Sequence, residues 1–411
     1  MEKKRQELTS LFRLARLYKT RGSDERFAAY VEKARALALD LLRDGAVPAT
    51  FVYSTLYRQG CHEPLFELAE AGESGQTDDA LLSMATAAAF ARNDPRLALA
   101  LAERIGDAEQ RCLRRKTAEL WADLHAPLTE EPRVHLLVLT HNRAACAERS
   151  LRLLGETAYR NYAVYIADNG SGDGTREIAL RAREFFPSYV QVAAQAFPVN
   201  IGRPAGHNWL VAGHDHSAAE FIAIADDDLT RIPPDWLTRM VRTAQLFPGC
   251  ACVGGKILVS GWPAMVQCGP FHMEKFGHPN GFTQKRLFGN EDLGQFDYID
   301  LVEHVAGCLH IFDRRALEEI GLFDIRFSPS QFVDVEHHLR LCLAGKTIVF
   351  NGLISCEHQN VPDRSLAEAR AATGNVVGNL VKLIHKHDEE EVRRALETRH
   401  QERAAWLEGD K

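Results

Sequence analysis

The stretch Phe221-Ile222-Ala223-Ile224-Ala225-Asp226-Asp227-Asp228 decides the fold class of this chain. Five apolar residues that end at polar turn residues predict a short strand buried on both faces. Three carboxylates at the end of such a strand repel one another unless a positive group lies among them. In an open α/β sheet this end of a strand is where ligands bind, so a divalent cation bridged to a phosphate would resolve the repulsion. A solvated turn with a helix N-cap is the alternative, because Asp favours both.

Strand and helix signals alternate on both sides of this stretch, which indicates parallel βαβ units. The predicted fold class is therefore α/β, with a mostly parallel, Rossmann-like sheet. The expected strands are 134–139, 163–167, 190–194, 221–225, 251–259, 300–312 and 347–351. The expected helices between and after them end near 155, cover 175–186, begin after Gly206, and cover 235–246, 315–321 and 334–344.

The first 128 residues predict helices only. Apolar residues from Leu8 to Tyr18 recur at helical spacing. Asn93-Asp94-Pro95 predicts the end of one helix and the beginning of the next. Short antiparallel helices suggest helix pairs similar to tetratricopeptide repeats, although no strict repeat signature is present. Such a layer is either a docking or dimerisation surface or a packing extension without a partner. The expected helices begin near residue 8 and then cover 27–42, 49–59, 63–72, 78–92, 95–105 and 108–125.

We therefore predict three segments: an all-helical domain at 1–128, an α/β domain at 129–362 and a C-terminal helical extension at 363–411. Pro127 and the acidic Thr129-Glu130-Glu131-Pro132 mark the first boundary as a linker. Two amphipathic helices, at 365–386 and 388–407, are expected to close the chain.

Composition and charge exclude several classes of protein. A content of 45% hydrophobic and 26% charged residues is that of an ordinary soluble globular protein. The net charge of −7 argues against a nucleic-acid partner. No stretch approaches the ~18 apolar residues of a membrane span, and the N-terminus lacks the apolar core of a signal peptide. Nine cysteines without a repeating spacing favour reduced thiols, so a cytoplasmic protein is expected.

Polar residues also follow the other predicted strands. Thr140-His141-Asn142-Arg143, after the first strand, can face a nucleotide and its phosphates or form an ordinary N-cap. In Asp168-Asn169-Gly170-Ser171-Gly172-Asp173-Gly174-Thr175 the glycines permit close backbone approach. Its first residue, Asp168, could accept a hydrogen bond from a base N–H, which uracil, thymine and guanine offer, or the segment could be a simple turn. Arg203, after the third strand, could meet a diphosphate or be a surface arginine.

In this order and with these gaps, the motifs resemble those of the family 2 glycosyltransferases of the GT-A fold. The resemblance covers roughly Val134 to Gln359 and implies inverting transfer from a nucleotide-diphospho-sugar to a hydroxyl group of a glycan, a lipid-linked sugar or a protein. A UDP-sugar is the favoured donor, with GDP- and dTDP-sugars as alternatives. The motifs that carry it are Thr140-His141-Asn142-Arg143, Asp168 to Thr175, Asn200-x-Gly202, Asp226-Asp227-Asp228, and Ile320-Gly321-Leu322-Phe323-Asp324 followed by Asp334.

The resemblance implies roles by position. Asp168 would bind the base N–H, Asp227 would reach the ribose, and Asp228 would coordinate Mn²⁺ or Mg²⁺, which bridges the donor diphosphate. Asp226 has the least defined role, in the donor site or in shaping the turn. The other residues expected at the nucleotide-sugar site are Thr140, His141, Asn142, Arg143, Asn200, Gly202 and Arg203.

Asp334 falls on the position of the family's catalytic aspartate, in a register fixed by Arg340 and Gly345. The usual pattern is Glu-Asp-x-Asp, and here Val333 and Glu336 replace two of the acids. The resemblance implies that Asp334 acts as the general base towards an acceptor hydroxyl; a helix N-cap is the alternative. His358 would be a further metal ligand, and an imidazole suits Mn²⁺ better than Mg²⁺.

The long polar and aromatic stretch 260–298 fits a loop over the acceptor, because aromatic faces suit sugar rings. An insertion that packs on itself is the alternative. The expected partners are the donor, the acceptor, and a protein partner or second copy bound through the N-terminal helices, with peripheral membrane contact left open. The residues that suggested the acceptor loop are Trp262, Phe271, His272, Phe276, His278 and Phe282.

Two other functions share some of these features. A sugar-nucleotide pyrophosphorylase would need a glycine-rich loop after the first strand, and the segment from His141 to Ala145 contains no glycine. In a non-catalytic nucleotide-sugar-binding scaffold, the function would lie in interactions of the helical layer. The presence of both the Asp226-Asp227-Asp228 triplet and Asp334 argues against such a scaffold.

Overall fold

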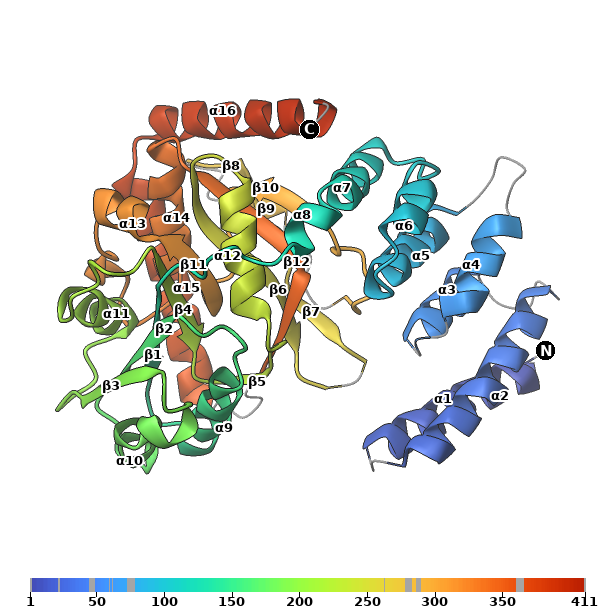
Figure 1. The fold of residues 1–411 in the computed structure, drawn as a ribbon, viewed down its shortest axis with the longest axis horizontal. Helices are drawn as coiled ribbons and strands as arrows, with labels where there is room; N and C mark the ends of the chain where they lie inside the picture. The colour runs from blue at the N-terminus through green and yellow to red at the C-terminus, as the bar shows by residue number, and fades with distance from the viewer. Residues whose placement is uncertain are drawn as a thin grey trace.

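The computed structural model describes residues 2–20, 23–43, 49–58, 60, 62–71, 78–261, 263–277, 283–285, 290–359 and 366–409. A ten-stranded mixed sheet forms its centre, with the order β10-β12-β6-β11-β4-β1-β2-β3, β5 paired to β12 and β7 paired to β6 (Figure 1). Its strands are β1 Val134–Thr140, β2 Tyr162–Asp168, β3 Gln191–Ala196, β4 Phe221–Asp226, β5 Leu229–Arg231, β6 Cys250–Val259, β7 Met265–Cys268, β10 Ile299–Val302, β11 Leu309–Asp313 and β12 Thr347–His358. A separate antiparallel pair is formed by β8 His272–Lys275 and β9 Thr283–Lys285.

One half of the sheet is parallel, as the alternation of strands and helices predicts. β1 pairs in parallel with β2 and β4, and β2 pairs in parallel with β3. The register places Thr140 opposite Asp168, and Leu139 opposite Asp226. The α/β fold class is confirmed, and the carboxyl ends of three parallel strands meet at one edge of the sheet.

The other half of the sheet is mixed and differs from the sequence-based expectation. β11 runs antiparallel to both β4 and β6, whereas β12 runs parallel to β6. The single strand expected at 300–312 is two strands, β10 and β11, and the short strand expected at 347–351 continues to His358 as β12. The stretch 260–298 contains β7, β8 and β9, so it is not one continuous loop.

The buried strand β4 shows why its sequence does not alternate between apolar and polar residues. Its side chains at Ile222 and Ile224 join one core cluster, whereas Phe221, Ala223 and Ala225 join the other. Both faces are therefore covered, as a parallel α/β sheet requires. The helices of this domain and the C-terminal extension are α9 Ala144–Gly155, α10 Thr175–Leu180, α11 Arg203–Ala212, α12 Trp236–Leu246, α13 Arg314–Ile320, α14 Val333–Leu343, α15 Leu366–Lys386 and α16 Glu389–Glu408.

The helices expected before residue 128 are confirmed. They are α1 Glu2–Thr20, α2 Asp24–Arg43, α3 Ala49–Arg58, α4 His62–Ala71, α5 Asp79–Ala91, α6 Pro95–Ala102, α7 Ala108–Glu119 and α8 Trp121–His125. None of the helices in the described part of the chain is long and apolar enough to span a membrane. The division into three domains stays a prediction.

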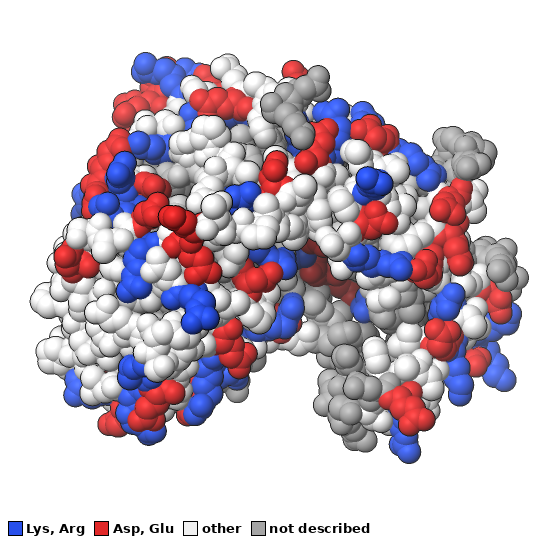
Figure 2. Space-filling view, viewed as in Figure 1, with Lys and Arg blue, Asp and Glu red and all other residues white. Residues whose placement is uncertain are grey.

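The helical layer packs directly against the edge of the sheet. The fully buried Arg114 of α7 donates to the carbonyl oxygen of Gly294 at 3.1 Å. Thr117 Oγ1 accepts a hydrogen bond from the amide of Ile299, the first residue of β10, at 2.8 Å. α7 thus fixes the end of the stretch 260–298. Lys and Arg are interspersed with Asp and Glu over the visible face of the molecule (Figure 2).

The aromatic residues of 260–298 that the structure describes do not form an acceptor loop. Phe271 and Phe276 are 3% and 9% exposed, so their rings pack into the protein and cannot face a sugar. His272 lies in a charged cluster instead. The remaining three residues of that prediction, Trp262, His278 and Phe282, lie outside the described residues. The described part of this stretch packs against α7, β10 and the residues after β10, so it fits neither an acceptor loop nor a mobile insertion that packs on itself.

His272 joins β8 to β10 and α16 through buried acids. Its Nε2 lies 3.0 Å from Asp300 Oδ2, and its Nδ1 lies 3.3 Å from Glu303 Oε2. From α16, Arg403 Nε reaches Asp300 at 2.7 Å and His400 Nε2 lies 3.6 Å from Glu303. Burial alone would lower the pKa of His272, but its hydrogen bonds to Asp300 and Glu303 raise the pKa to about 9.

This cluster predicts a pH dependence of stability. Because the folded-state pKa of His272 lies above its value of 6.5 in the unfolded chain, the stabilisation is complete below pH 6.5 and is lost as the pH rises through 9. We expect His272 to contribute roughly 2–3 kcal/mol to the loss of unfolding free energy over this interval. Urea unfolding at pH 6 to 10 measures it. His272→Gln should flatten the curve relative to His125→Gln, and equal slopes in the two variants would contradict the assignment.

Candidate active site

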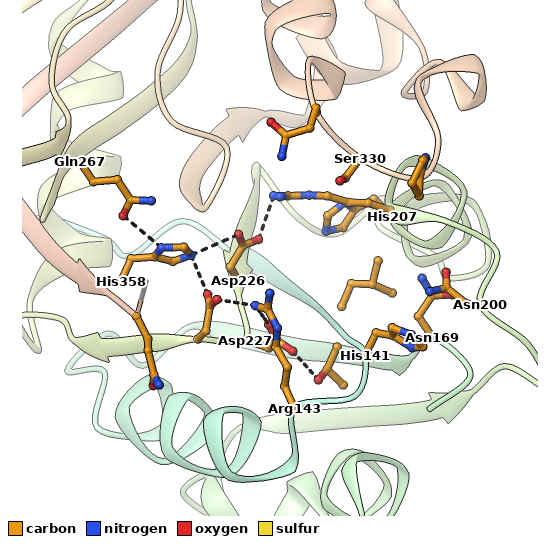
Figure 3. A pocket seen from close by; sticks show the side chains of 17 residues that line it. His141, Arg143, Asn169, Asn200, His207, Asp226, Asp227, Gln267, Ser330 and His358 are labelled. Carbon is orange, nitrogen blue, oxygen red and sulfur yellow. Dashed lines mark hydrogen bonds and ion pairs between the residues drawn. The ribbon is translucent and has the colours of Figure 1, made fainter. Parts of the chain in front are cut away.

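A cavity of about 630 Å³ lies at the edge where β1, β2 and β4 end (Figure 3). The walls also include the loop before α14 and the end of β12. Nine of the residues expected at the site line it: Thr140, His141, Arg143, Asn200, Arg203, Asp226, Asp227, Asp228 and His358.

Two acids of the triplet converge on a histidine. Asp228 Oδ1 lies 2.7 Å from His358 Nε2, and Asp226 Oδ2 lies 3.9 Å from the same nitrogen. Each of the three residues offers one ligand atom, and these atoms lie within 4.8 Å of one another. His358 Nδ1 lies 3.1 Å from Gln267 Oε1, a contact that turns Nε2 towards the acids (Figure 3). Two carboxylate oxygens and one imidazole nitrogen form a ligand set that suits Mn²⁺.

The remaining acid of the triplet, Asp227, contacts the end of β1 and Arg143. Asp227, which is 5% exposed, accepts a hydrogen bond from Thr140 Oγ1 at 2.5 Å, and its Oδ1 lies 3.4 Å from Arg143 Nη1. Burial raises the pKa of Asp227 to about 6, against the charge of Arg143. The three consecutive acids are therefore divided, with Asp227 on the β1 side and its two neighbours beside His358.

Two arginines supply the positive charge that the triplet needs. Arg143 Nη1 contacts both Asp227 and Asp228, and Arg203 donates to Asp226 Oδ1 at 2.8 Å. Burial alone would raise the pKa of Asp228, but the hydrogen bond with His358 and the charge of Arg143 lower it. Asp228, 2% exposed, is therefore ionised at neutral pH and can offer its negative charge to a cation.

Asp334 lies at the start of α14 and is not among the residues that line the cavity. Its Oδ2 accepts a hydrogen bond from the amide of Gly307 at 3.0 Å, and His304 Nε2 lies 3.8 Å from the same oxygen. A Cβ atom at residue 307 would lie 2.5 Å from that oxygen, so only glycine permits this approach. Gly307 also accepts a hydrogen bond from Arg203 at 2.8 Å. Gly307 thus connects Asp334 to Arg203, which contacts Asp226. We call Asp226, Asp228 and His358 the metal-ligand group.

The charges around Asp334 keep it ionised. Burial alone would raise its pKa, but the charges of His304 and Arg203 lower the pKa below its ordinary value. Its side chain is 31% exposed, so the carboxylate is accessible to solvent.

Residues 136–321 match the family model described as glycosyl transferase family 2. The chain carries a family 2 glycosyltransferase domain. The match contains the strand-end motifs of β1, β2 and β4, and it ends before α14, so Asp334 and His358 lie beyond it. The recognition of this family from the sequence is confirmed for the matched segment.

Two proteins are similar in sequence to part of this chain. The uncharacterized protein y4gI of Sinorhizobium fredii is 27% identical over 273 residues, which are 64% of this chain and 28% of that protein. Glycosyltransferase AglE of Haloferax volcanii is 26% identical over 232 residues, or 55% of this chain and 66% of that protein. The chain thus spans less than two thirds of the length of either relative.

Two solved structures are similar to this chain at lower sequence identity. The mannosyltransferase PcManGT from Pyrobaculum calidifontis, in complex with GDP-Man and Mn²⁺, has 19% identity and a TM-score of 0.46 over 80% of this chain and 88% of that chain. GalNAc-T7 with UDP, GalNAc and Mn²⁺ has 13% identity and a TM-score of 0.49 over 63% of this chain and 48% of that chain.

Three residues expected at the donor site of the glycosyltransferase do not line the cavity but shape its loops. The Asn142 side chain accepts from the Gly172 amide at 2.8 Å, joining the loops after β1 and β2. Asp168 is fully buried, and its oxygens accept from the Ser171 amide at 3.1 and 3.3 Å. Gly202 has φ 85°, and a Cβ atom there would lie 2.8 Å from Ser328 Oγ. The contact of Asp168 with a base stays a prediction.

Sequence reasoning missed several residues that line the cavity. Asn169 is the direct neighbour of Asp168, so the strand-end motif already marked its position. Gln267 on β7 and the pair Ser330-Gln331 lie in segments without a recognisable motif, and only the tertiary structure brings them to the site. The missed residues are Leu139, Asn169, His207, Gln267, Pro329, Ser330, Gln331 and Gln359.

A second group among the described residues has ligand atoms close enough for a metal ion. It comprises Cys252, His310 and His338, all buried between the sheet and α14. His338 already pairs with His304, with 2.7 Å between their Nδ1 atoms. Burial raises the pKa of the Cys252 thiol well above its usual range, so the thiolate that binds metals is disfavoured. We therefore interpret this group as part of the packed core.

Proposed function

We propose that this glycosyltransferase transfers a sugar from a nucleotide-diphospho-sugar to a hydroxyl acceptor with inversion, and that it depends on a divalent cation. The observation that carries the proposal is the convergence of Asp226, Asp228 and His358 at the end of β4. The cavity of about 630 Å³ is in the range of sites that hold ligands of nucleotide-sugar size. When bound there, Mn²⁺ or Mg²⁺ would stabilise the nucleoside diphosphate as a leaving group.

The cavity residues divide into two groups around the donor. Arg143 and Arg203 carry the positive charge at the cavity wall and would contact the diphosphate. Asp227 would contact the ribose, and Asp168 would accept the base N–H. The polar residues left for the nucleoside are Thr140, His141, Asn169 and Asn200, and Ser330 and Gln331 would face the transferred sugar and the acceptor.

Asp334 would serve as the general base. It takes the proton from the acceptor hydroxyl as that oxygen attacks the anomeric carbon, and the bond from this carbon to the diphosphate oxygen breaks on the opposite face. Attack opposite to the leaving group inverts the configuration. The ionised state of Asp334 and its partial exposure support this role.

The donor and acceptor are proposed by class. Because Asp168 would accept a base N–H, UDP-sugars are the first donors to test, followed by GDP- and dTDP-sugars. The imidazole of His358 favours Mn²⁺ over Mg²⁺. A glycan, a lipid-linked sugar and a protein remain the acceptor classes.

Metal removal tests the proposal. We expect chelation by EDTA to reduce nucleoside diphosphate release from the accepted donor by on the order of 10²–10³-fold, because the leaving group loses its counter-charge. Mn²⁺ should restore the rate at a lower concentration than Mg²⁺. His358→Gln should raise the Mn²⁺ concentration needed, whereas the distant His125→Gln should not. Full turnover in the metal-free protein would refute the proposal.

A further inference from the structure

The C-terminal helix α15 reaches the loop that leads to Asp334. Asn379, 1% exposed, donates through Nδ2 to three backbone carbonyl oxygens: Phe327 at 2.9 Å, Ser330 at 2.8 Å and Gln331 at 3.0 Å. An amide nitrogen carries two hydrogens, so one of them is shared between two acceptors. One buried side chain thus holds most of the turn before α14.

This loop needs an external partner because its backbone is unusual. Gln331 has φ 76° and Phe332 has φ 59°, in the left-handed region that residues with side chains rarely adopt. Such a conformation persists only where surrounding contacts enforce it. The loop matters to the site at both of its ends. Pro329, Ser330 and Gln331 line the cavity, and α14 with Asp334 begins directly after Phe332.

Further residues on the same face of α15 hold both sides of Asp334. Lys382 Nζ donates to the carbonyl oxygen of Arg326 at 2.6 Å and to Asn379 Oδ1 at 2.9 Å. Lys386 Nζ lies 2.5 Å from Oε1 of the fully buried Glu336. Residues 379, 382 and 386 are spaced by three and four, so they share one face of the helix. That face contacts the chain before Asp334 and again two residues after it.

We propose that α15 is a positioning element of the active site, with Asn379 as the positioning residue that aims Asp334 and the 329–331 wall at the acceptor. The inference rests on the proposed role of Asp334. The proposed metal ligands and Arg143 lie on other elements, and the Arg203 amide donates to the carbonyl oxygen of Pro329 at 2.9 Å. Asn379 therefore acts chiefly on the side of the transferred sugar and the acceptor. This assigns a positioning role in the active site to a helix that lies outside the segment 136–321 matched by the family model.

The test compares Asn379→Ala with Val377→Ala in the full chain. Val377 is on the same helix and 56% exposed, so it controls for a general effect on α15. We expect Asn379→Ala to lower kcat for transfer by roughly 10- to 100-fold, because a small misplacement of a reacting group has effects of this size. The Kd for the nucleotide with Mn²⁺ should change less than about twofold. Hydrogen exchange should rise at 326–335 and stay unchanged in β1 and β4.

Lys382→Ala serves as a milder variant if Asn379→Ala does not fold. It removes the bond that orients the Asn379 amide, and we expect the same split between kcat and Kd with a smaller change. A wild-type kcat in either folded variant would overturn the inference, as would an equal loss of nucleotide affinity. Failure of the underlying function is recognised separately, because Asp334→Asn would then leave transfer unchanged.

Discussion

Asp228→Asn is expected to reduce transfer by about 10³-fold, which corresponds to about 4 kcal/mol of transition-state stabilisation. The substitution keeps the size of the side chain but removes the negative charge that faces His358 Nε2 at 2.7 Å. It also leaves Arg143 with Asp227 as its remaining carboxylate in the triplet. Both the affinity for Mn²⁺ and the binding of the nucleotide that depends on it should therefore fall.

Two measurements separate this effect from misfolding. Titration calorimetry should show weaker binding of Mn²⁺ and of the nucleoside diphosphate in its presence, while the far-UV spectrum stays that of the wild type. Asp123→Asn is the matched control, because the same chemical change is made at an exposed position of α8. Near-normal turnover of Asp228→Asn at limiting Mn²⁺ would show that the cation site lies elsewhere.

Asp334→Asn should produce the opposite pattern, with chemistry lost and donor binding kept. We expect kcat to fall by roughly 10²–10⁴-fold, the usual contribution of a general base. The amide oxygen of asparagine can still accept from the Gly307 amide, so the start of α14 should keep its place. The metal-ligand group lies on other elements, so the Kd for nucleotide with Mn²⁺ should stay within about twofold.

The rate should be followed by transfer to an accepted acceptor and by release of nucleoside diphosphate without one. Loss of transfer with unchanged nucleotide binding is the expected result. Equal loss of transfer and of nucleotide binding would mean that Asp334 supports the fold of the cavity rather than the proton transfer. Normal transfer would exclude it as the base.

The sequence predicts the parallel half of the sheet well because each of its strands is a continuous apolar run that ends in a polar motif. Phe221 to Ala225 is buried on both faces, and no other element type suits such a short run between turns. The neighbouring strand-end motifs meet at one edge through the register of β1 with β2 and β4. Local pattern and tertiary position agree here, so residues that line the cavity at these strand ends could be named in advance.

The remaining parts depend on contacts between segments far apart in the sequence. Gln267 orients His358 across 91 positions, and Asn379 holds Gln331 across 48. Phe271 and Phe276 suggested an exposed surface because aromatic residues in a polar stretch have no periodicity that reveals burial. Gly307, between β10 and β11, approaches Asp334 closely, and no local pattern marks that contact. Such constraints come from packing and leave no local signal.

The position of β12 has a consequence for how the protein is made. β12 lies between β10 and β6, although both of these strands precede it in the chain. During translation the place between them stays empty until the segment ending at residue 358 has left the ribosome. His358 arrives with that strand, so the three proposed ligands meet only when the sheet is closed. A polypeptide terminated before β12 would carry the aspartate triplet without His358, and cation binding would report that synthesis has passed β12, before α15 is added.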